Sequence, residues 1–189
     1  MDIQLNTLLV ALMFVTILSM GIGNILVALA DIFNHVTPSR RDRVHVSWIC
    51  LMLLVHFNIF WHTKEILNVE NWEFGGFLMT IAGPVLMFFA TSIMLTDPPT
   101  EAEPGKTRFF DALGKRFFWM FAALQLWIVL VGFSLTGHFV TTDIANVLFG
   151  VLAIALALST APRFQVLGVW LAWGLGLSSF AIRWLAQGG

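Results

Sequence analysis

The feature that most constrains this chain is a series of six apolar stretches, most of them about as long as a bilayer is thick. A helix needs about 20 mostly apolar residues to cross the hydrocarbon core. Only 11 % of the residues are charged and 58 % are hydrophobic, and lipid accepts such side chains on the outside of a bundle. We expect an all-α, polytopic transmembrane helix bundle that forms a single domain over residues 1–189. The expected spans are approximately 7–30, 44–63, 75–96, 117–136, 143–160 and 166–186.

The basic residues fall almost entirely into alternate loops. Of the ten, only Lys64 and Arg183 lie on one side, and the other eight lie on the opposite side. The eight are Arg40, Arg41, Arg43, Lys106, Arg108, Lys115, Arg116 and Arg163. The positive-inside rule then predicts a cytoplasmic loop at 97–116 and both termini on the outer side, which is periplasmic in a bacterium. The fifth stretch is the shortest, so five spans with one re-entrant segment is the alternative.

Tryptophans give a second indication of the same layout, because their rings prefer headgroup depth. Three lie near the inner ends of the expected spans, namely Trp48, Trp119 and Trp170. Three lie at or just beyond the outer ends, namely Trp61, Trp72 and Trp184. Trp127 lies in the middle of a span, and Trp173 lies one turn deeper than Trp170.

Part of the chain resembles a known group of proteins. The second expected span contains WICLMLLVHFNIFWH. NWEFGGF leads into the third, and GPVLMFFATSIMLTDP continues from the middle of the third to Pro98, just past its end. Over Trp48–Pro98 these segments resemble a broad bacterial group of small six-span inner-membrane proteins. The resemblance implies six spans in a bacterial inner membrane, and it carries over no functional residue.

A polar side chain inside a span is the best pointer to function, because the membrane core makes it costly. Asn58, His62 and Glu65 are spaced i, i+4 and i+7 at the outer end of the second span, so they share one side of a helix. This stripe is the candidate ion or proton site, and a hydrated helix end is the alternative. No HxxxH or HExxH motif accompanies it, so we expect no metal site.

Three further charged or ionisable residues lie at the outer ends of the spans. His138 and Asp143 come from the fourth loop and are secondary candidates that could converge on the stripe. Arg183 is also a secondary candidate, although it most simply extends to the outer headgroups. The other polar residues inside the expected spans are Asn24, Cys50, Gln125 and Asn146.

His56 lies deep in the second span. Its chemistry suits a proton carrier, a haem ligand, or a neutral structural histidine bonded to a nearby carbonyl. Haem b between helices needs a second axial histidine, for which His62 and His138 are the options. The structural role is favoured, so we expect no cofactor, with haem b through His56, His62 or His138 as the alternative.

Small residues predict close helix contacts. Gly168, Ala172 and Gly176 repeat every fourth residue in the sixth span, which lets another backbone approach. We expect contacts within the bundle, with a homo-oligomer interface as the alternative. Gly83 and Pro84 predict a kink in the third span.

Absent motifs, the single cysteine and the net charge exclude several classes of function. The chain has no P-loop, GxSxG or dinucleotide-binding motif and a single cysteine, so we expect no enzyme. A net charge of −1 without a basic tail argues against nucleic acid, and the expected partner is the lipid bilayer. We favour a small channel or transporter for an ion or small solute. The alternatives are an accessory or structural subunit of a membrane complex, and a redox subunit that binds haem or quinone.

Overall fold

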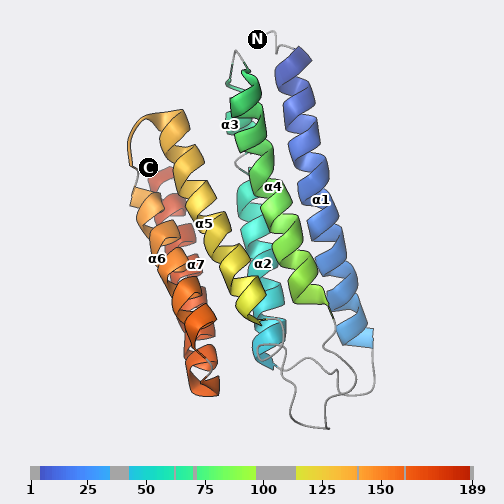
Figure 1. Cartoon of the computed structure of the whole chain (residues 1–189), viewed down its shortest axis with the longest axis vertical. Helices are drawn as coiled ribbons and strands as arrows, with labels where there is room; N and C mark the ends of the chain where they lie inside the picture. The colour runs from blue at the N-terminus through green and yellow to red at the C-terminus, as the bar shows by residue number, and fades with distance from the viewer. Residues whose placement is uncertain are drawn as a thin grey trace.

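The computed structural model describes residues 5–34, 43–61, 63–69, 72–96, 114–139, 141–159 and 161–187. Within these ranges the chain is all-α, as predicted (Figure 1). The helices are α1 (Leu5–Asn34), α2 (Arg43–Trp61), the one-turn α3 (Thr63–Ile66), α4 (Phe74–Leu95), α5 (Lys115–Thr136), α6 (Thr141–Leu158) and α7 (Pro162–Gln187). Each long helix begins and ends within four residues of a predicted span. Most of the predicted loop at 97–116 lies outside the described residues.

Five helices are long and apolar enough to cross a membrane, namely α1, α2, α4, α5 and α7. They indicate a multi-pass membrane protein in contact with lipid. The remaining long helix, α6, is apolar over the shorter segment Asp143–Leu158 and packs between α5 and α7. A sixth crossing by α6 stays a prediction.

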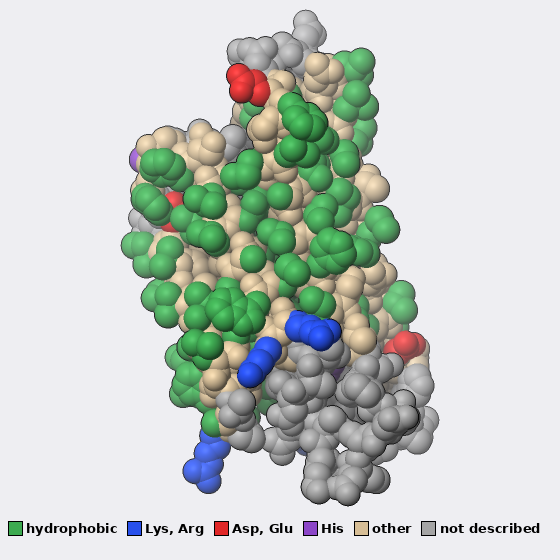
Figure 2. Space-filling model, in the orientation of Figure 1, with side chains coloured by type: hydrophobic (Ala, Val, Ile, Leu, Met, Phe, Trp, Pro, Cys, Tyr) green, Lys and Arg blue, Asp and Glu red, His purple; other side chains and the backbone are tan. Residues whose placement is uncertain are grey.

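The six long helices close into a ring in the order α1, α4, α5, α6, α7, α2 and back to α1. Consecutive long helices run in opposite directions, so α2, α5 and α7 begin at the same end of the bundle (Figure 1). Arg43, Lys115, Arg116 and Arg163 lie at these beginnings, and we call this the basic end. Figure 2 shows Lys and Arg side chains gathered there. The start of α1 and the end of α7 lie toward the opposite end.

An aromatic cluster fills the ring at the basic end. The Trp48 ring meets Phe117, Phe118 and Phe121 edge to face, with centroids 5.2–6.0 Å apart. Such pairs add to the free energy of burial. Trp48 is only 1 % exposed, so its predicted place among the headgroups is wrong: α2 turns this residue inward, onto the first turns of α5.

Two other tryptophans at the same end behave as the aromatic belt predicts. Trp119 is 51 % exposed and Trp170 is 72 % exposed. Trp119 lies about one turn, and Trp170 just over two turns, from the start of its helix. Their rings therefore lie on the outside of the bundle, where headgroups and lipid meet.

The small residues of α7 make close contacts with other helices of the same chain. A Cβ atom on Gly168 would lie 2.6 Å from a methyl carbon of Leu156 in α6. Ala172 is fully buried, and a Cβ on Gly176 would lie 3.6 Å from Leu51 in α2. This face of α7 packs on α6 and α2, and nothing at these residues supports the homo-oligomer alternative.

The helix α4 continues through Pro84, which lacks the N–H that would bond the carbonyl of Thr80. Trp127 of α5 lies against this point. Its indole occupies the space beside Gly83, where a Cβ atom would overlap the ring. Its Nε1–H donates to the carbonyl of Met79, just over one turn before the proline. The mid-span tryptophan thus finds a partner for its donor on the neighbouring helix α4.

The charge distribution generates a test of orientation. In a Cys50→Ser background, single cysteines replace Lys64 or Arg163, which are exposed near opposite ends of the bundle. A membrane-impermeant maleimide should label Lys64→Cys in intact cells, and Arg163→Cys only after permeabilisation, because the basic end is expected in the cytoplasm. The reverse labelling pattern would contradict the orientation.

The contact between Gly83 and Trp127 generates a test of packing. Gly83→Ala should lower the thermal unfolding midpoint in detergent, because overpacking typically costs about 1–3 kcal/mol. Gly174→Ala is the matched control, since nothing lies within 4 Å of a Cβ at that position. It should leave the midpoint unchanged or raise it, because alanine favours a helix by up to about 1 kcal/mol over glycine. Equal midpoints for the two variants would mean that Trp127 does not constrain α4.

Candidate functional site

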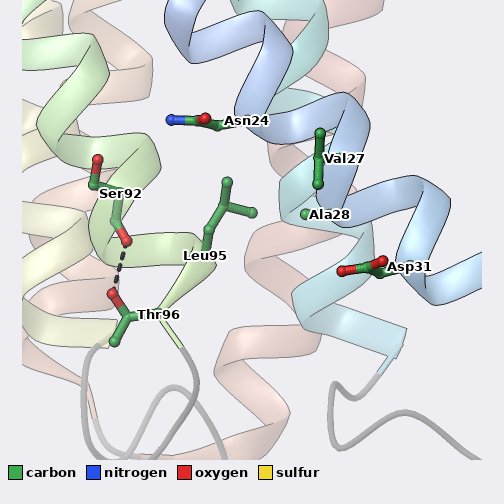
Figure 3. Close-up of a pocket in the computed structure, with 7 residues that line it drawn as sticks. All are labelled: Asn24, Val27, Ala28, Asp31, Ser92, Leu95 and Thr96. Atoms are coloured by element: carbon green, nitrogen blue, oxygen red, sulfur yellow. Dashed lines mark hydrogen bonds between the residues drawn. The ribbon is translucent and has the colours of Figure 1, made fainter.

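An open groove separates the last turns of α1 from those of α4 at the basic end. Its volume is about 360 Å³. It is lined by Asn24, Val27, Ala28, Asp31, Ser92, Leu95 and Thr96 (Figure 3). The lining is therefore amphipathic: a carboxylate, an amide and two hydroxyls lie among apolar side chains.

The length of α1 brings a charge into this groove. Its 30 residues extend about 45 Å, which exceeds the roughly 30 Å of a hydrocarbon core. Asp31, predicted to lie in a loop, is in the last turn of α1 instead. A carboxylate at interface depth is compatible with a continuing helix, because it reaches the headgroup region.

Asn24 lies deeper in the same groove. It precedes Asp31 by seven residues, which is about 10 Å along the helix. Its side chain is exposed and points toward α4 (Figure 3). An amide that faces dry lipid would leave its polar atoms unsatisfied, at a cost of a few kcal/mol. The exposed Asn24 amide is therefore better accommodated by water or a polar solute than by lipid.

The α4 side of the groove presents oxygen atoms. The Ser92 hydroxyl donates to the carbonyl of Phe88 at 2.9 Å, and that of Thr96 donates to the carbonyl of Ser92 at 2.8 Å (Figure 3). Both hydroxyl protons are thus directed to the backbone. What the oxygens offer a ligand is lone pairs.

His56 is fully buried where α1, α2 and α4 meet. Its Nδ1 donates to the carbonyl of Met52 at 2.8 Å. In the neutral ring Nε2 is then the acceptor, and the Thr91 hydroxyl of α4 lies 3.5 Å from it. On the α1 side, a Cβ atom on Gly21 would lie 2.5 Å from Nε2. The second ring nitrogen therefore abuts the backbone of α1.

The groove and His56 lie along the same helix–helix seam. Ala28, in the groove, follows Gly21 by seven residues, and Leu95 follows Thr91 by four. These spacings place each pair on one face of its helix. Ile25 is fully buried between Gly21 and Ala28. Residues of the groove and residues beside His56 therefore share one face of α1 and one face of α4, and the buried Ile25 lies between the two sets on α1.

The predicted stripe of Asn58, His62 and Glu65 is only partly described. Asn58 is exposed and lies on a different face of α2 from the buried His56. His62 and the side chain of Glu65 lie outside the described residues, as does the side chain of Arg183. The convergence of the stripe on one ion stays a prediction.

The secondary candidates of the fourth loop lie away from α2. His138 is exposed in the connection between α5 and α6. Asp143 is only 4 % exposed, in the first turn of α6. One of its carboxylate oxygens lies 3.6 Å from where a Cβ on Gly132 of α5 would be. Because the ring neighbours of α2 are α1 and α7, the structure does not bring Asp143 to the stripe.

The surroundings of His56 do not fit an axial haem ligand. A porphyrin iron would have to lie in front of Nε2, and the backbone of α1 at Gly21 occupies that space. His138 belongs to the α5–α6 connection, across the ring from this seam. In the part of the chain that the structure describes, no three His, Cys, Asp or Glu side chains are grouped so as to hold a metal ion.

None of the family models, curated proteins and solved structures compared with this chain matches it. The candidate site therefore rests on the chain's own geometry. Sequence reasoning singled out His56 and noted Asn24, but it missed the groove. The sequence signal for the groove was the i, i+7 spacing of Asn24 and Asp31. This spacing places both side chains on one helix face only if α1 continues beyond its apolar segment as far as Asp31.

Proposed function

We propose that this protein moves a small cation across the bacterial inner membrane, and that the groove between α1 and α4 is its cytoplasmic entrance. The observation that carries the proposal is the pair Asn24 and Asp31. Both are exposed in a groove on a helix built to cross lipid. Polar groups inside transmembrane helices commonly mark ion pathways; Asn24 is such a group, and Asp31 lies at interface depth on the same helix.

The chemistry of the lining favours a cation. Asp31 supplies negative charge at the mouth, and Asn24, Ser92 and Thr96 supply neutral oxygen atoms. Carboxylate, amide and hydroxyl oxygens are the ligands that hard cations prefer. Within the groove the Asp31 carboxylate would repel an anion.

The proposed route runs along the α1–α4 seam and not down the axis of the ring. The aromatic cluster around Trp48 fills the ring at the basic end. The seam holds the groove, then the apolar Ile25, then His56. An apolar residue between two polar compartments is the arrangement by which a hydrophobic constriction gates. In this proposal the described conformation corresponds to the closed state.

Cation flux into proteoliposomes tests the groove. The purified protein is reconstituted, and Na⁺ and K⁺ uptake is measured against protein-free vesicles. Asn24→Leu and Asp31→Asn should each lower the flux at least about tenfold, equivalent to roughly 1.4 kcal/mol of lost stabilisation. Leu26→Ala is the matched control, because Leu26 is exposed on α1 but does not line the groove. Wild-type flux no greater than that of empty vesicles would refute the proposal.

The outer stripe is the proposed exit. If Asn58, His62 and Glu65 hold the ion there, His62→Ala and Glu65→Gln should each reduce the flux and flatten its dependence on pH between about 5.5 and 8, because both side chains lose the ability to change charge. The measurement is the same uptake assay, with Asp31→Asn as the positive comparison. Wild-type flux in both stripe variants would leave the stripe as an ordinary hydrated helix end.

A further inference from the structure

We infer that His56 is a proton-binding site at the inner end of the α1–α4 seam, so that the cation movement proposed above is coupled to a proton taken up by one imidazole. This inference rests on the proposed function for the coupling. The proton site itself stands on the contacts of His56.

The imidazole is set up to accept a proton at one atom. The bond from Nδ1 to the Met52 carbonyl holds the ring and fixes the tautomer. It leaves Nε2 with a lone pair directed at the α1–α4 seam. The Thr91 hydroxyl, at 3.5 Å, is at the limit of hydrogen-bond distance and engages this lone pair weakly.

Thr91 can follow the change of protonation. When Nε2 gains a proton, an N–H bond forms and the ring becomes an imidazolium. The Thr91 oxygen then accepts from Nε2, and its own hydroxyl proton turns to the carbonyl of Met87, four residues earlier. The hydroxyls of Ser92 and Thr96 already make this type of bond to their own helix. The same two side chains therefore serve both protonation states.

Few other titratable groups belong to the helices packed around His56. On α1 the described titratable side chain is Asp31, ten residues from Gly21 and thus about 15 Å along the helix. On α2 they are Arg43, His45 and Cys50, and α4 carries none between Phe74 and Leu95. His45 lies three turns away, where it donates to the carbonyl of Met94 at 2.7 Å.

This distribution links the proton to the groove. Along the described lengths of these three helices no carboxylate faces the ring, so an imidazolium at His56 needs water or an approaching counter-charge. The groove, with Asp31 at its mouth, is the source of both on this seam. Protonation thus favours a conformation in which Ile25 admits water, and deprotonation favours the closed conformation described here.

The absence of a side chain at Gly21 is part of the site. Because a Cβ there would lie 2.5 Å from Nε2, alanine must displace the ring or fill the space that a proton donor needs. Gly23, two residues on, would have nothing within 4 Å of an added Cβ atom and provides the matched control on the same helix.

The test combines proton flux with a direct titration. The full-length protein is reconstituted into vesicles that enclose a pH-sensitive dye, and H⁺ flux and K⁺ flux are recorded separately. His56→Gln should lower H⁺ flux at least tenfold. Gly21→Ala and Thr91→Val should each lower it several-fold, and Gly23→Ala should leave it unchanged. In parallel, ¹⁵N-histidine NMR of the same protein should show one ring that gains a proton at Nε2, with its signal lost in His56→Gln.

The outcomes separate the two proposals. Wild-type H⁺ flux in a folded His56→Gln variant, or a His56 ring that does not titrate between about pH 4 and 8, overturns the proton site and leaves K⁺ flux to be judged alone. Titration of His56 without flux of any cation supports the proton site and overturns the proposed function. Equal H⁺ flux in Gly21→Ala and Gly23→Ala would also count against the site.

Discussion

Lipid offers no hydrogen-bond partner, and the interior of this bundle depends on that constraint. Many polar side chains on the helices bond to a neighbouring helix or to their own backbone, although the buried Trp48 Nε1 and Gln125 Oε1 do not. Trp127 donates to α4, Trp173 donates to Ser47 at 2.8 Å, and His45 donates to Met94 at 2.7 Å. Each of these bonds ties one helix of the ring to another, so satisfying polar groups and fixing the helix order are one process.

The groove between α1 and α4 differs from the bundle interior, because polar side chains are exposed there. Large exposed hydrophobic side chains lie on all six long helices, as lipid contact requires. In the groove an amide and a carboxylate are exposed side by side with leucine and valine. The helix α1 approaches His56 of α2 closely at Gly21, and the groove lies further along α1, between its last turns and those of α4.

Much of the fold could be predicted from the sequence, because span length and charge distribution respond to the bilayer itself. The six long helices and the basic end follow from these two patterns. The burial of Trp48 could not be predicted, since it depends on how α2 rotates against α5. Likewise, the groove arises from the separation of α1 and α4, which no spacing in one helix encodes. His56 was recognisable by its depth, but its contacts with Gly21 and Thr91 join three helices. The stripe at Asn58 stays a prediction, because its other two side chains lie outside the described residues.

The contact of Trp127 with α4 has a consequence for how the chain enters the membrane during synthesis. When α4 emerges, Pro84 has already removed the donor for one carbonyl, and the turn before it is open beside Gly83. The indole that covers this turn is more than forty residues further along the chain, in α5. Until α5 is made, the backbone of α4 beside Gly83 faces lipid instead of the indole, and the Thr80 carbonyl that Pro84 leaves without a helix donor lies in the same turn. The two helices are therefore expected to leave the insertion machinery as a pair, with α4 held at its exit until its partner arrives.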